Sequence, residues 1–123
     1  QLVEHWQDIA EDYAAGRIYL PQDGLRRFGV IESQLAGRHA PPTLRQLLTF
    51  EVARAQALLT RGSALVGELR GPARIAVAGF VGGGQAALDA IARAGFDVLP
   101  GAPKAAPTAI LRASARVLRR GRL

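Results

Sequence analysis

Three carboxylates gather within six residues near the start of the sequence, in the segment QDIAED. Asp8 and Asp12 are four residues apart, so a helix would place them one turn apart on one face, with Glu11 beside them. Like charges at this spacing destabilise a helix by about 0.2 to 0.5 kcal/mol per pair, so folding alone does not favour them. Two such carboxylates can hold Mg²⁺ through oxygen and leave positions for water or phosphate. The pattern therefore indicates either a magnesium site or a solvated acidic helix face.

An arginine and a tyrosine follow the acidic segment directly. Arg17 offers a guanidinium group that can bind an anion through two parallel hydrogen bonds, and Tyr19 offers a phenolic donor. Beside a magnesium site, these two side chains are what an anionic diphosphate requires. Their presence favours the metal-site interpretation of Asp8 and Asp12 over a solvated face.

The carboxylates belong to a two-faced helix that we predict over residues 2–13, ended by Gly16. Apolar residues recur there at spacings of four and three, so they share a face opposite the acids. These residues are Leu2, Trp6, Ile9 and Tyr13. Core packing is the expected role of Trp6.

Helical periodicity continues along the rest of the chain. Breakers and caps divide it into four further predicted helices, over residues 21–29, 44–69, 73–94 and 109–120. Thr43 and Gln46 form the pattern of a capping box before the second of these, and Gly95 is the expected left-handed cap of the third. Since no segment alternates at period two, we expect an all-α fold of antiparallel, bundle-type helices.

The composition narrows the class of protein. The 123 residues and 49% apolar content suit one domain or a large piece of one, and the lack of cysteine excludes disulfides and thiolate chemistry. No apolar run approaches the roughly 20 residues of a membrane-spanning helix, and no signal-peptide pattern occurs. We therefore expect a cytoplasmic protein, soluble or peripheral at a membrane. Because the chain has no methionine and begins within a helical pattern, we also expect a segment of a longer protein.

Basic residues dominate the other end of the chain, which has a net charge of +6 and a pI of about 11.2. Four arginines lie on one side of the predicted last helix: Arg112, Arg116, Arg119 and Arg120. This stripe is either a solvated helix face or a peripheral contact with an anionic membrane, worth about 1 kcal/mol per base near the surface. Nucleic acid is disfavoured as a partner because no aromatic residue is interleaved with the arginines.

Residues 7–21, QDIAEDYAAGRIYLP, resemble the second aspartate-rich motif of the squalene/phytoene synthase family, a DxxxD followed by an arginine, a tyrosine and Leu-Pro. The segments LRQLLTFEVARAQALL and VAGFVGGGQAALDAIARAGFDVL resemble the C-terminal helices of that family more loosely. The resemblance implies that residues 1–123 are the C-terminal portion of a single isoprenoid synthase domain with a helical-bundle fold. The first aspartate-rich motif of the family would then lie in a missing N-terminal part.

The resemblance also implies roles for individual residues. Asp8 and Asp12 would be Mg²⁺ ligands, with Glu11 as a weaker candidate. Arg17 and Tyr19 would contact the diphosphate of a prenyl substrate.

Two positions depart from the commonest family pattern. Glu4 stands where the family has an asparagine, and Gln7 stands where an arginine is common. Gln7 is similar to the hydroxysqualene synthase branch of the bacterial hopanoid pathway, so the resemblance favours that branch. Glu4 adds a further carboxylate beside the proposed metal ligands.

The activity that the resemblance implies is Mg²⁺-dependent isoprenoid synthesis. An enzyme of the hydroxysqualene branch would ionise presqualene diphosphate and form hydroxysqualene, whereas a squalene synthase would condense two molecules of farnesyl diphosphate. With only one of the two acidic motifs, the fragment alone is expected to be inactive. The rival class is a non-enzymatic basic helical module that binds anionic membrane or nucleic acid.

Residues 79–88, GFVGGGQAAL, lack the Gly-Lys-Ser/Thr ending of a phosphate-binding loop, so we favour close helix packing instead. Given the family resemblance, Phe80 and the glycines would also be candidates to line an isoprenoid cavity. We interpret His5 as a partly buried helix histidine rather than an acid–base group, and His39 as an exposed loop residue.

Overall fold

The computed structural model describes residues 1–121. These residues form helices and loops without a strand, which confirms the predicted all-α class. In chain order the helices are α1 (Leu2–Gln7), α2 (Ile9–Ala14), α3 (Gln22–Phe28), the 3₁₀ helix η1 (Glu32–Ala36), α4 (Pro42–Ser63), α5 (Leu65–Glu68), α6 (Gly71–Arg93) and α7 (Pro107–Arg120).

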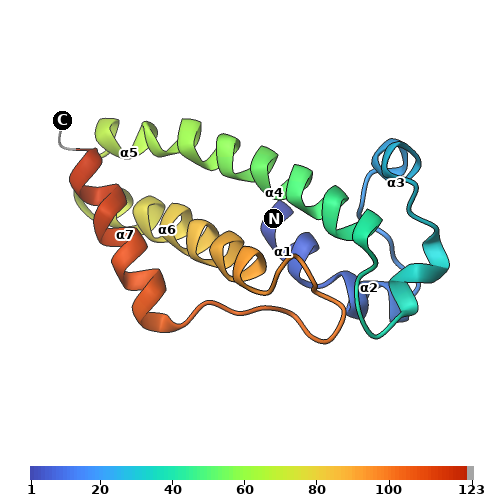
Figure 1. Cartoon of the computed structure of the whole chain (residues 1–123). Helices are drawn as coiled ribbons and strands as arrows, with labels where there is room; N and C mark the ends of the chain where they lie inside the picture. Colours follow the sequence, from blue (N-terminus) through green and yellow to red (C-terminus); the bar gives the residue numbers. More distant parts are fainter. Residues whose placement is uncertain (122–123) are drawn as a thin grey trace.

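The two longest helices, α4 and α6, run antiparallel and side by side (Figure 1). α7 packs against α6 near the α5 end of this pair, and α1 contacts both long helices. α3 and η1 lie at the opposite end of the molecule, where α3 packs on α4. This arrangement places α1 beside the middle of the long pair and α2 toward the end of the molecule that holds η1.

The prediction of one long helix over residues 44–69 is wrong at both ends. α4 begins at Pro42, whose fixed φ suits the first helical turn, and no side chain caps it. The expected capping box is therefore absent, and Thr43 Oγ1 is buried without a hydrogen-bond partner among residues 1–121. At the other end the helix stops at Ser63, whose hydroxyl donates to the Thr60 carbonyl at 2.7 Å, and the short α5 follows.

The C-terminal end of α6 follows the prediction. Gly95 has φ +65°, a left-handed conformation that a residue without Cβ adopts at little cost, and its N–H donates to the Ala92 carbonyl at 3.0 Å. The next N–H, of Phe96, donates to the Ile91 carbonyl at 3.0 Å. Phe96 then packs partly buried against the core, as expected for the residue after a glycine cap.

Two hydrophobic clusters stabilise the fold. The larger joins α1 to α4 with the end of α6 and the loop after it. It contains Trp6, Ile9, Leu20, Leu25, Val30, Leu35, Ala40, Leu44, Leu47, Leu48, Ala55, Leu88, Ile91, Val98 and Leu99. The smaller lies between α5, α6 and α7 and contains Val66, Ala78, Val81 and Val117. Trp6 is only 2% exposed, which confirms its predicted place in the core.

An ionic cluster at Asp97 ties the loop before α4 to the loop after α6. The carboxylate accepts hydrogen bonds from the Ala40 N–H at 2.8 Å and from Arg45 Nη2 at 3.3 Å, and lies 2.9 Å from His39 Nδ1. Burial alone would raise the pKa of Asp97, but the hydrogen bonds and the positive charge of Arg45 together lower it below its usual value of 3.8. His39 is exposed as predicted, yet its ring has a specific partner.

Within residues 1–121, α6 is one helix long and apolar enough to cross a membrane by length and composition. The sequence had indicated no such segment. α6 contacts both α4 and α7, and 33% of its apolar stretch is buried.

Candidate active site

The acidic segment forms two short helices rather than the single one predicted. α1 ends at Gln7 and α2 begins at Ile9, with Asp8 between them at φ −99° and ψ 20°. This sparsely populated bridge conformation is one in which active-site residues are often found. The backbone hydrogen bonds nevertheless continue through the break, since the Asp8 N–H donates to the Glu4 carbonyl at 3.0 Å and the Asp12 N–H donates to the Asp8 carbonyl at 2.8 Å. Asp8 and Asp12 therefore remain one turn apart.

The candidate metal ligands differ in exposure. Asp8 and Asp12 are both half-buried, and the Asp12 side chain is 15% exposed, whereas Glu11 is exposed. Carboxylate oxygens are suitable ligands for Mg²⁺, and partial burial limits competition from solvent. No cluster of three metal-ligating side chains occurs in the part of the chain that the structure describes. These residues could therefore supply one side of a metal site, with Asp8 and Asp12 as its ligands and Glu11 at its edge.

Arg17 lies directly beside Asp12. Its backbone N–H donates to the Asp12 carbonyl at 2.7 Å, and its guanidinium Nη2 lies 3.3 Å from Asp12 Oδ1. The Arg17 side chain remains 57% exposed, so it can reach a ligand in solvent. The structure thus brings a candidate metal ligand and a candidate phosphate ligand into contact.

Tyr19 is held against α1 by a contact that the sequence did not indicate. Its ring stacks on the His5 ring, with centroids 4.0 Å apart and an angle of 18° between the planes. Tyr19 is 46% exposed, which leaves its phenol accessible. His5 is half-buried, as predicted for a helix histidine, and its ring packs against that of Tyr19. Aromatic residues fourteen positions apart carry no local signal for such stacking.

Gln7 joins the acidic segment to the loop between α6 and α7. Its Nε2 donates to the Pro103 carbonyl at 2.6 Å. At the position where the family commonly has an arginine, this chain therefore has a neutral amide with a structural partner. Gln7 holds the loop against α1 instead of supplying positive charge to a ligand.

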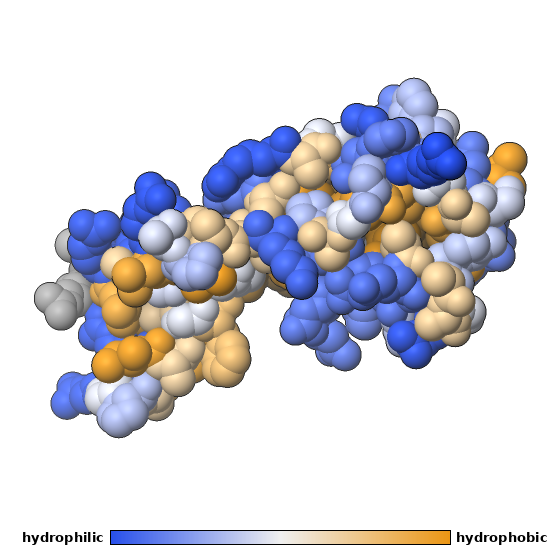
Figure 2. All heavy atoms as spheres, turned by 90° about the horizontal axis from the view of Figure 1, so that it is seen from below, coloured by the Kyte–Doolittle hydropathy of each residue, from blue (hydrophilic) through white to orange (hydrophobic). Residues whose placement is uncertain are grey.

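A hollow of about 450 Å³ lies beside α1 and is lined by residues from α1, α4 and α6. Glu4 and Gln7 line it on one side, and Phe80, Gly83 and Gly84 line it on the other. Phe80 is 79% exposed, and hydrophobic side chains gather over α6 and α7 on the surface seen in Figure 2. The predicted cavity residue Phe80 thus lies across a hollow from the acidic helix.

The glycines of α6 have separate roles. A methyl group added at Gly82 would overlap Ser114 of α7, and one at Gly84 would lie 3.0 Å from Leu59 Cδ1. These two glycines allow the close helix packing that the sequence suggested. Gly79 has no neighbouring atom within 4 Å of such a methyl group, so its side faces open space.

Comparison with known proteins identifies the family. A model of the squalene/phytoene synthase family matches residues 1–119, and the chain therefore belongs to that family. It is 36% identical over 100 residues to a phytoene synthase of Thermus thermophilus, a match covering 80% of this chain and 34% of that protein. A 15-cis-phytoene synthase of Synechocystis sp. is 39% identical over 56 residues, which cover 46% of this chain and 17% of the relative.

The phytoene synthase of Arthrospira platensis is 37% identical over 60 residues, covering 49% of this chain and 19% of that relative. The chain thus spans 34% or less of the length of the relatives it matches. No solved structure shows a significant match.

Proposed function

We propose that the full-length protein containing this chain is a Mg²⁺-dependent isoprenoid synthase that ionises a prenyl diphosphate. Membership of the squalene/phytoene synthase family supports this proposal. The observation that carries it is the contact between Asp12 and Arg17, at 3.3 Å, one turn from Asp8. A candidate metal ligand and a candidate diphosphate ligand are then neighbours, as a metal-bound diphosphate requires.

In this proposal, some residues of this chain bind the metal and others bind the diphosphate. Asp8 and Asp12 would hold Mg²⁺, and Glu11 would assist at the edge of the site. The bound metal supplies a Lewis acid for the departing diphosphate. Arg17 would exchange its exposed ion pair with Asp12 for two hydrogen bonds to the diphosphate, and Tyr19 would donate a third.

The hollow beside Phe80 suits the apolar part of such a substrate. Apolar side chains and glycines form much of its wall, and Glu4 lies at its acidic edge. An apolar pocket with a few polar groups at one end is the usual form of a small-molecule site. The prenyl chain would lie along α6, with its diphosphate toward Asp8 and Asp12.

For the finer reaction we propose the hydroxysqualene branch, in which presqualene diphosphate is converted to hydroxysqualene. Gln7 supports it, because this position is similar to the hydroxysqualene branch, whereas an arginine is commoner in the family as a whole. The second candidate is head-to-head condensation of two allylic diphosphates, as a phytoene or squalene synthase performs. It is favoured by the names of the relatives. Supplying the full-length enzyme with presqualene, farnesyl or geranylgeranyl diphosphate and identifying the products by mass spectrometry distinguishes the two.

The decisive test of the activity is Asp8→Asn with Asp12→Asn in the full-length protein. We expect Mg²⁺-dependent diphosphate release to fall by about a thousandfold, the scale of losing preorganised charge stabilisation. Glu32→Gln with Glu68→Gln removes the same two charges from exposed positions elsewhere and should leave turnover unchanged. Retained turnover in the aspartate variant would contradict the proposal.

The isolated 123 residues should release no diphosphate, because this chain provides one acidic motif. The rival hypothesis is a non-enzymatic basic module that binds anionic membrane or nucleic acid. If it holds, no form of the full-length protein shows turnover, and the two aspartate substitutions leave ligand binding unchanged.

A further inference from the structure

A polar groove lies between α7, α6 and α4, away from the hollow beside Phe80. It consists of two adjoining hollows of about 230 and 200 Å³ that share Asp89 and Arg116 in their lining. Neither shares a residue with the hollow beside Phe80. Phe80 and Asp89 are nine residues apart on α6, so at about 100° per residue they lie on opposite sides of that helix.

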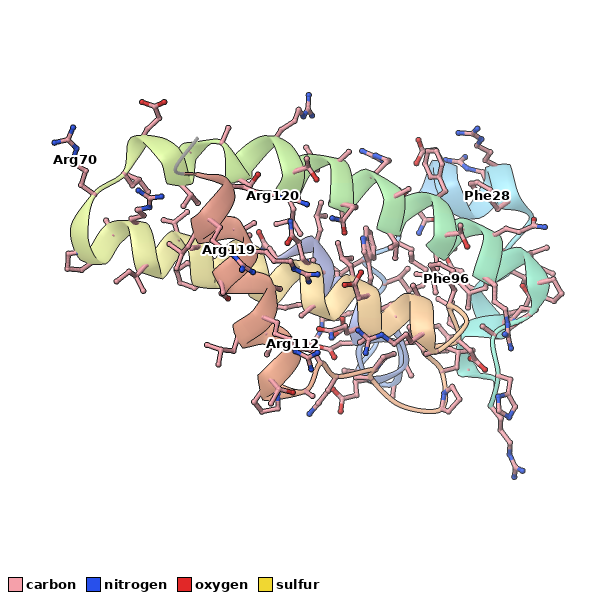
Figure 3. All side chains as sticks on the ribbon, turned by 60° about the vertical axis from the view of Figure 1, so that its left-hand side comes forward. Phe28, Arg70, Phe96, Arg112, Arg119 and Arg120 are labelled. Atoms are coloured by element: carbon pink, nitrogen blue, oxygen red, sulfur yellow. The ribbon has the colours of Figure 1, made fainter. Side chains whose placement is uncertain are left out.

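Arginine is the dominant side chain of this groove. Arg93 of α6 and Arg112, Arg116 and Arg120 of α7 line it, against one acidic residue, Asp89. Figure 3 shows Arg112, Arg119 and Arg120 following one another along α7 beside the ribbons of α4 and α6. The two helices therefore direct four guanidinium groups into one concave surface.

These charges have no ionic partner in the described residues. The ion pairs found within residues 1–121 involve Arg17, His39, Arg45 and Arg54, and none involves the groove arginines or Asp89. Each guanidinium group has five N–H donors. Among residues 1–121, the groove arginines make one hydrogen bond, a long one of 3.4 Å from Arg112 Nε to the Thr108 carbonyl. The groove therefore retains donors for a ligand.

The spacing of the arginines is unfavourable for the helix itself. Arg112, Arg116 and Arg120 follow one another at intervals of four residues, where like charges destabilise a helix. An anion in the groove would relieve that repulsion. Planar guanidinium groups match the oxygens of a phosphate bidentately, so the arginines supply the donors of this lining.

We propose that the groove between α4, α6 and α7 binds a phosphate-bearing anion, either free diphosphate or the phosphate of an anionic lipid headgroup. This site is separate from the proposed catalytic residues, so the proposal does not depend on the enzymatic activity. The two ligands share one recognition chemistry, phosphate oxygens held by several arginines.

The test measures binding by the full-length protein without Mg²⁺ or prenyl substrate, in an Arg17→Gln background that removes the other phosphate candidate. One arm titrates inorganic diphosphate by calorimetry. The other sediments phosphatidylcholine vesicles with and without phosphatidylglycerol. Arg112→Gln with Arg116→Gln should weaken binding by about tenfold or more in the arm that reports the true ligand.

Two further variants make the test specific. Asp89→Asn removes the acid of the groove and should tighten binding by about two- to fivefold, a gain that damaged folding would not produce. Arg26→Gln with Arg38→Gln removes two exposed charges at the other end of the molecule and should change little.

Each outcome decides the proposal. Loss with diphosphate identifies a free phosphate ligand, and loss only with anionic vesicles identifies a lipid headgroup. Absence of binding in both arms overturns the proposal. Equal weakening by the Arg26 and Arg38 control also overturns it, because general charge would then explain the binding.

Discussion

The two hydrophobic clusters of this protein are built in different ways. The larger is filled by large side chains such as Trp6, Leu44 and Ile91, which are 2% exposed or less. The smaller, between α5, α6 and α7, has four buried members, and α7 approaches α6 there through Gly82. The first region is stabilised by the burial of large side chains. In the second region, the close packing of α7 on α6 requires that residue 82 have no side chain.

The largest expected effect concerns the first region. Trp6→Ala should lower the free energy of unfolding by about 3 to 5 kcal/mol, because it leaves a cavity where a buried indole packed. Urea denaturation of the full-length protein measures this, with Trp6→Phe as a control that keeps most of the apolar contact. A loss below about 1 kcal/mol for Trp6→Ala would show that the larger cluster does not depend on its largest member.

The matching test of the second region is a pair of identical substitutions in α6. Gly82→Ala places a methyl group against Ser114 and should destabilise by up to about 3 kcal/mol, the usual cost of overpacking. Gly79→Ala faces open space and should instead stabilise by up to about 1 kcal/mol, because alanine is the better helix former. Thermal unfolding of both variants decides this, and equal shifts in Tm would contradict the packing role of Gly82.

A third prediction concerns the ionic cluster at the edge of the larger region. Asp97→Asn should destabilise by about 1.5 kcal/mol at neutral pH, because it removes charge-assisted hydrogen bonds. The folded pKa of Asp97 lies below its usual 3.8, so its contribution is present above that pH and is lost as the pH falls through the lower folded value. The difference between wild type and variant should therefore shrink in acid.

Denaturation at several pH values measures this difference. Asp89→Asn is the matched control, since Asp89 is exposed and has no ion pair among residues 1–121. If the stability difference between wild type and Asp97→Asn instead grew toward low pH, the predicted direction of the pH dependence would be wrong.

The smallest effect is expected at the His5 and Tyr19 contact. His5→Ala should destabilise by about 0.5 kcal/mol, at the low end for aromatic pairs because Tyr19 is partly exposed. A double-mutant cycle with Tyr19→Ala isolates the pairwise energy. A coupling energy of zero would show that the stacking does not stabilise the fold.

The local features of the site were predictable, and the contacts between its parts were not. The carboxylate spacing put Asp8 and Asp12 on one face, and the arginine that follows them is indeed adjacent to Asp12. The break at Asp8 was missed because the apolar period runs through it unchanged. The partner of Gln7 was missed because Pro103 lies 96 residues away.

The sequence by itself determined the all-α class, the acidic and apolar faces of the first segment, and the left-handed cap at Gly95. These depend on side-chain periodicity and backbone conformation over a few residues. Only the tertiary structure decided that His5 stacks on Tyr19, that Asp97 binds the loop at Ala40, and that arginines from α6 and α7 share a groove with α4. Such contacts depend on how the helices pack, and helical periodicity specifies which face is buried but not which distant residue will meet it.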